Sequence, residues 1–184
     1  MNRAGSLLVL LLSVATLGAQ AQPRPEAAPT AQIEAMKKLA WLEGTWEGSA
    51  SFMTAAGASP AKSWERVALA AGGTALLIQG RHFGVGADGQ AGPMLHDAAG
   101  LISFDERAAR YRVVTQTREG RGGSFEGRVE NGVFSWFIPR PGGHVRYDIA
   151  RNDKGQWHEV GYSCSDGAPC VEFLRMTLER KGAP

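Results

Sequence analysis

The stretch LEGTWEG, residues 42–48, lies where the periodicity of the chain changes. Before it, apolar side chains recur at the spacing of an amphipathic helix; after it, they alternate with a period of two, as in half-buried strands. Thr30 is the expected N-cap of the helix and Gly44 its end. The helical apolar positions are Ile33, Met36, Leu39, Ala40 and Leu42. The stretch also places a large aromatic, Trp46, between two glycines, Gly44 and Gly48.

About ten strands are predicted after Gly44, separated by turn residues at short, regular spacing. Pairs such as Asn131-Gly132 and Asp166-Gly167 favour tight hairpins, because both central residues of such turns must tolerate positive φ. The expected strands cover residues 45–53, 62–70, 74–85, 95–104, 110–118, 122–130, 132–139, 144–151, 156–164 and 170–180.

This order of elements predicts an all-β, up-and-down antiparallel barrel over residues 30–181. Closing a long meander into a barrel removes its two unpaired edges. Glycines inside the expected strands, such as Gly80 and Gly161, permit the coiling that closure needs. A β-sandwich is the alternative, but its crossing connections would need longer links than most of these. The N-terminal helix is expected to cap one end of the barrel.

The first 21 residues have the pattern of a secretory signal peptide. A short segment with Arg3 precedes the apolar run LLVLLLSVATL, and Ala19 and Ala21 are the small residues of a cleavage site after Ala21. An uncleaved anchor is the alternative, although the run is shorter than the roughly 20 residues that span a bilayer. Residues 22–29, QPRPEAAP, are predicted to be a linker. The expected location is the periplasm or the exterior of the cell.

The charge of the chain bears on its partners. The formal net charge is +2, with no run of Lys or Arg, and nucleic-acid binding requires a concentrated basic face. We therefore expect no nucleic-acid partner. Stable membrane insertion is not expected either, because no aromatic girdle of an outer-membrane barrel is readable.

Cys164 and Cys170 are the two cysteines of the chain, with SDGAP between them. In an oxidising compartment so close a pair predicts a disulfide. A two-cysteine metal site is the alternative, but no His lies near them at ligand spacing.

The motif Gly44-Thr45-Trp46 resembles the G-x-W signature of lipocalins and their calycin relatives. That resemblance implies a Trp that closes the barrel floor, with an Arg from a terminal strand across its ring, an arrangement that gains cation–π energy. The last strand offers Arg175 and Arg180. Trp46, Gly44 and Arg180 are therefore expected to have structural roles.

The longer stretch LAWLEGTWEG, residues 39–48, resembles nitrobindins, which implies a ten-stranded barrel that binds haem through one His of the last strand. In this chain the matching position is Arg175, which has no lone pair for iron. We therefore expect no cofactor and keep haem binding as an alternative. The stretch GLISFD, residues 100–105, also resembles a group of uncharacterised secreted bacterial domains.

Candidate ligand residues come from one resemblance and from side-chain alternation. Fatty-acid-binding proteins, a related family, hold the carboxylate of their ligand with an Arg of the last strands. This resemblance makes Arg175 a candidate ligand residue if its side chain points inward. The alternatives are that Arg175 stacks on Trp46 or is exposed to water. His82 lies among polar groups inside a strand. Alternation places aromatic side chains on one face of several strands, as pocket wall or core. These aromatic candidates are Tyr111, Trp136 and Tyr147.

The sequence contains no motif for catalysis. A nucleophile elbow, a zinc-protease helix and a phosphate-binding glycine loop are all missing from it, so no catalytic or metal-binding residue is assigned. The expected function is the binding of a small, mainly hydrophobic ligand inside the barrel, with an acidic ligand as one option. The alternatives are a haem protein of the nitrobindin type and a structural protein with a filled barrel.

Overall fold

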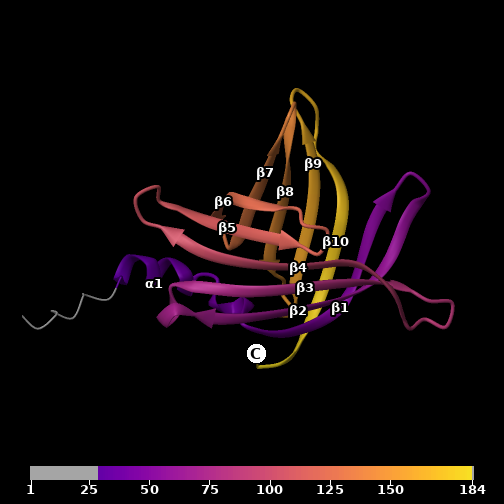
Figure 1. Cartoon of the computed structure of the whole chain (residues 1–184), viewed down its shortest axis with the longest axis horizontal. Coiled ribbons are helices and arrows are strands. Elements are labelled where there is room, and N and C mark those ends of the chain that lie inside the picture. The colour runs from indigo at the N-terminus through magenta and orange to yellow at the C-terminus, as the bar shows by residue number, and fades with distance from the viewer. Residues whose placement is uncertain (1–28, 184) are drawn as a thin grey trace, which may run out of the picture.

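A computed structural model describes residues 29–183 of the chain. Ten antiparallel strands form one closed barrel, and the strands of one half cross those of the other at a steep angle (Figure 1). The strands are β1 (Gly44–Thr54), β2 (Gly57–Ala70), β3 (Ala75–Val85), β4 (Ala91–Asp105), β5 (Arg110–Thr117), β6 (Gly122–Glu130), β7 (Val133–Arg140), β8 (Gly143–Arg151), β9 (Trp157–Ser165) and β10 (Val171–Gly182). The predicted barrel is confirmed.

Each strand pairs with its neighbours in the sequence, and β1 pairs with β10 to close the ring. At this seam Trp46 is opposite Arg180. The two glycines of the opening stretch both approach β10: a Cβ on Gly48 would lie 2.1 Å from the Thr177 carbonyl oxygen, and one on Gly44 would lie 2.9 Å from the Gly182 carbonyl oxygen. The seam therefore closes because these two positions carry no side chain.

Two strands begin earlier than predicted. β2 starts at Gly57 and β4 at Ala91, so the β1–β2 hairpin remains paired out to Thr54 and Gly57. Near the tip both faces of this hairpin are exposed, and Gly57, Ala58 and Pro60 all meet solvent. A segment with no buried face has no apolar alternation, which is why the pattern missed it.

The N-terminal helix is shorter than predicted and has two parts, α1 (Thr30–Lys37) and the 3₁₀ turn η1 (Ala40–Leu42). Its N-cap is Pro29, so Thr30 is the first helical residue rather than the cap. Met36, Leu39 and Leu42 are fully buried in one core cluster with Trp46. The helical segment therefore covers the barrel end that contains Trp46, called the closed end below.

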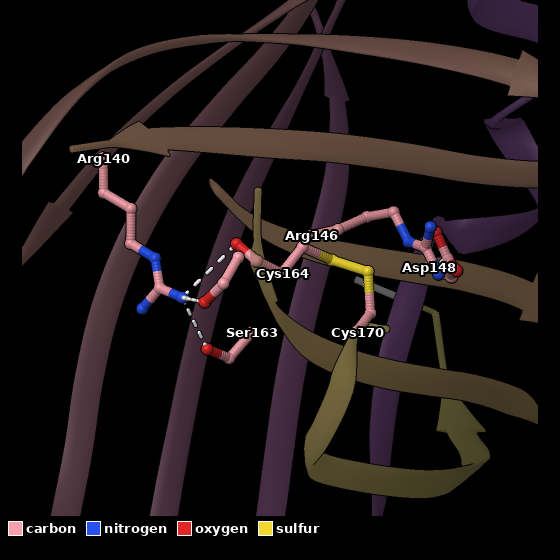
Figure 2. Close-up of a disulfide and its surroundings, with 7 residues drawn as sticks. Arg140, Arg146, Asp148, Ser163, Cys164 and Cys170 are labelled. Carbon is pink, nitrogen blue, oxygen red and sulfur yellow. Dashed lines mark hydrogen bonds and ion pairs between the residues drawn. A yellow bond between two sulfur atoms is a disulfide. The ribbon is translucent and has the colours of Figure 1, made fainter. Parts of the chain in front are cut away.

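The cysteines form the predicted disulfide, which joins Cys164 of β9 to Cys170, the residue before β10, with the two Cα atoms 4.1 Å apart (Figure 2). Beside it, the Arg140 guanidinium donates hydrogen bonds to Ser163 Oγ at 2.8 Å and to the Cys164 carbonyl at 3.4 Å. These contacts join β7 to the β9–β10 hairpin. A disulfide in the folded chain is compatible with an exported protein.

The predicted signal peptide, residues 1–21, and all but the last residue of the predicted linker lie outside the described residues. No helix within residues 29–183 is long and apolar enough to cross a membrane.

Candidate ligand-binding site

The barrel encloses a cavity of about 630 Å³. Every strand except β6 contributes to its wall, and most of the lining side chains are apolar. Cavities of a few hundred Å³ with apolar walls and a few polar groups are typical of small-molecule sites. The apolar lining side chains include Ile78, Phe134, Trp136, Ile138, Ile149 and Phe173.

Three tryptophans form the closed end beneath the cavity. The rings of Trp41, Trp46 and Trp157 meet edge to face, with centroid distances of 5.9–6.2 Å. Trp46 is 1% exposed and donates a hydrogen bond from Nε1 to the Leu42 carbonyl at 2.7 Å. Arg180 lies over the Trp46 ring, 4.5 Å from its centroid, and donates to the carbonyls of Glu43 and Trp41. Cation–π attraction and these hydrogen bonds hold β10 to the helix–strand junction.

The structure places Arg175 on the outer face of β10 rather than inside the barrel. Its side chain is 51% exposed, forms an ion pair with Glu172, and lies 3.4 Å from His158 Nε2. The cause is the alternation along β10, where Leu174, Met176 and Leu178 point inward and are buried. Arg175 therefore cannot bind a carboxylate in the cavity, and the expectation based on fatty-acid-binding proteins is corrected here.

The aromatic candidates divide into two groups. Trp136 and Tyr147 are cross-strand neighbours that line the cavity, with their rings stacked at a centroid distance of 4.6 Å. Tyr111 lies outside the cavity lining: it is 4% exposed, and its hydroxyl donates to the Ala35 carbonyl at 2.7 Å. Tyr111 thus ties α1 to the barrel and belongs to the core.

His82 lines the cavity farther from the closed end, on β3. Its ring stacks on His96 at 5.4 Å, and its Nδ1 lies 2.8 Å from Ser63 Oγ. Burial, together with the smaller effect of the neighbouring His96, lowers the pKa of His82 to about 4. At neutral pH this histidine is therefore uncharged.

Two buried carboxyl groups in the cavity wall, Glu65 and Glu159, were missed from the sequence. Burial raises the pKa of Glu65 well above its ordinary value, and the nearby Glu159 adds to the shift. Burial also raises the pKa of Glu159 to about 7, although a hydrogen bond from Trp157 Nε1 at 3.1 Å opposes this. One signal was present in the sequence: Glu65 falls on the same alternating face as Ser63 and Val67, and Glu159 on that of Trp157 and Gly161.

The polar and aromatic side chains of the cavity wall determine which molecules the cavity can bind. It offers two carboxyl groups, neutral histidines and stacked aromatic rings to a molecule in an apolar chamber. Residues 29–183 contain no cluster of three or more His, Cys, Asp or Glu that could hold a metal ion.

The residues do not fit haem binding of the nitrobindin type. The position that would supply the iron ligand holds Arg175, an exposed side chain outside the cavity.

No protein-family model matches this chain, and no curated protein matches it either. Among solved structures, the chain is similar to the crystal structure of Rv2717c from M. tuberculosis, with 17% sequence identity and a TM-score of 0.60. The match covers 85% of this chain and 99% of that chain. At this identity the likeness shows the fold alone.

Proposed function

We propose that this chain is an exported, calycin-like binding protein that holds a small, mainly apolar molecule inside its barrel. The observation that carries the proposal is the cavity of about 630 Å³ walled by aromatic and aliphatic side chains. Burying apolar surface there would stabilise a ligand by roughly 25 cal/mol per Å² removed from water. Export rests on the sequence of residues 1–21, with which the disulfide is compatible.

Two features weigh against the alternatives. A structural protein with a filled barrel would leave no internal space of this size, since protein interiors are close-packed. The acidic ligand considered from the sequence depended on Arg175, and within residues 29–183 no Lys or Arg lines the cavity. The proposal therefore keeps the apolar ligand and omits its acid group.

Fluorescence titration with N-phenyl-1-naphthylamine, an apolar dye that brightens on leaving water, tests this function. We expect saturable binding of one dye per chain. Ala98 lines the cavity on β4, so Ala98→Trp should fill part of the space and weaken dye binding at least about tenfold, the effect of losing roughly 1.4 kcal/mol.

The matched control is Val114→Trp, which adds the same ring at a position on β5 that is 39% exposed. This variant should bind the dye as the unmodified protein does. Dye binding that fails to saturate, or that survives unchanged in Ala98→Trp, would contradict a ligand site in the barrel.

A further inference from the structure

Glu65 is a buried carboxyl group in the cavity wall that receives no hydrogen bond from the described residues. It is 7% exposed and lines the cavity wall from β2. No residue within 29–183 donates a hydrogen bond to its carboxyl group. Leaving a buried polar group unpaired costs about 1–3 kcal/mol, and more for a charged one. Because Glu65 lines the cavity, a molecule inside the cavity can supply the missing donor.

The opposite strand makes room for this carboxyl group. Gly80 on β3 is the cross-strand neighbour of Glu65, and a Cβ at Gly80 would lie 2.6 Å from both carboxylate oxygens. Any other residue at Gly80 would displace the Glu65 side chain. The position of the carboxyl group therefore depends on the absence of a side chain across the strand pair.

Glu159 on β9 is the second carboxyl group of the cavity wall, and it lies beside Trp157 of the closed end. It is 9% exposed, and Oε2 accepts the hydrogen bond from Trp157. Its Oε1 accepts no hydrogen bond from the part of the chain that the structure describes. Glu159 lies close enough to Glu65 for its charge to raise the pKa of Glu65 further.

Among the described residues that line the cavity, none is a Lys or Arg that could balance these groups. The cavity's other ionisable side chains are Tyr147, whose pKa burial raises to about 12, and the histidines His82 and His96, whose pKa values burial lowers. All three are therefore neutral at pH 7. A ligand that brings a positive charge and N–H donors would stabilise the ionised form of these carboxyl groups and satisfy their oxygens, whereas a carboxylate ligand would find no cation to pair with.

We propose that the ligand of this cavity is an apolar amine, whose ammonium group binds between Glu65 and Glu159 near the closed end of the barrel. This inference rests on the proposed function and names the class of ligand for the same site. An ammonium group has three donors, which suits two carboxyl groups with free oxygens. The apolar part of the ligand would lie against Ile78, Phe134 and Ile149.

Three compounds of equal length, decylamine, decan-1-ol and decanoate, test this inference by displacement of the fluorescent dye. Decylamine should bind at least about tenfold more tightly than decan-1-ol, because hydrogen bonds to charged groups are worth about 1.5–3 kcal/mol. Decanoate should bind most weakly. In a double Glu65→Gln and Glu159→Gln variant, the preference for the amine should disappear while decan-1-ol binds as before.

The matched control is Glu47→Gln, which neutralises an exposed carboxyl group on the outer face of β1; it should keep the preference. If amine and alcohol bind equally, or if the preference survives in the double variant, the amine inference fails and the apolar binding function stands. If the dye binds and none of the three compounds displaces it, the amine inference fails alone; the binding function fails only if the dye itself does not bind.

Proton release gives a second readout that needs no variant. At pH 7 a carboxyl group that is protonated in the free protein should ionise when it meets the ammonium group. Calorimetric titrations of decylamine in buffers with different heats of ionisation should therefore reveal protons released on binding, and decan-1-ol should release none. Amine binding without proton release would overturn the inference.

Discussion

At the scale of single residues, Trp46 joins three parts of the molecule. Its ring packs against Trp41 of the helical segment and Trp157 of β9, and it lies under Arg180 of β10. Trp46→Ala is expected to lower the free energy of unfolding by about 3–5 kcal/mol, the range for deleting a buried large aromatic side chain. Urea denaturation followed by circular dichroism measures this change.

The control for Trp46 is Leu77→Ala, a truncation at a position that is 48% exposed. It should change the free energy of unfolding by no more than about 0.5 kcal/mol. If Trp46→Ala costs less than about 1 kcal/mol, Trp46 does not hold the closed end together.

Glu159 should make stability depend on pH. Its pKa is raised by burial to about 7 in the folded chain, against about 4.3 in an unfolded one. The folded state keeps this proton where the unfolded state has lost it, so the contribution is present at low pH and is lost as pH rises through 7. Between pH 5 and pH 8 the free energy of unfolding should fall by about 2 kcal/mol more in the unmodified protein than in Glu159→Gln.

Urea denaturation of both proteins at the two pH values measures this difference. His82 and His96 titrate in both proteins and cancel in the comparison, which therefore reports Glu159 together with its effect on Glu65. If the free energy of unfolding falls equally in the two proteins between pH 5 and pH 8, Glu159 is already ionised in the folded chain at pH 5.

At the scale of elements, the seam between β1 and β10 is the contact that turns a meander into a ring. A Cβ at Gly48 would lie 2.1 Å from the Thr177 carbonyl oxygen and 2.9 Å from the Leu178 Cα, which are backbone atoms that cannot rotate away. Gly48→Ala should therefore destabilise the protein by at least about 2 kcal/mol, within the cost of overpacking, as measured by urea denaturation.

Gly84→Ala is the matched control, because a Cβ there would meet its nearest atom at an ordinary 3.8 Å. This variant should remain near the stability of the unmodified protein. Equal effects of the two substitutions would show that the cost comes from the lost glycine and not from the seam.

The elements also show how much of the structure the sequence could predict. All ten strands were predictable, because each has one face inside the barrel and one outside. Leu174, Met176 and Leu178 mark the inward-facing side of β10. Counted from them, the same alternation puts Arg175 on the outer face of the strand and Arg180 on the inner face, over Trp46. The candidate site was harder to predict from the sequence. Alternation shows which face of a strand a side chain occupies, but it does not show how far along the barrel axis that side chain lies.

Depth along the barrel separates Tyr111 from Tyr147. Both face inward, but Tyr111 lies where α1 covers the barrel and Tyr147 lies beside the cavity. Glu65 and Glu159 were missed for another reason: a lone Glu within a strand is most often solvated. Only the closed ring shows that the two carboxyl groups face one chamber.

At the scale of the whole molecule, the barrel combines a rigid closed end with an internal chamber. The tryptophans, α1 and the β1–β10 seam close one end, and above them the cavity is large enough for a small molecule. The carboxyl groups lie between these two regions, where they can contact a ligand that reaches the bottom of the chamber.

The most direct measurement is a native mass spectrum of the full chain, produced in a bacterium and recovered from the periplasm, beside its denatured mass. We predict a chain that begins at Gln22 and carries one small molecule, which is lost on denaturation and is absent from Ala98→Trp prepared in parallel. An unliganded mass in the native spectrum, with no uptake of added decylamine or decan-1-ol, would contradict the claim that this barrel is a binding protein.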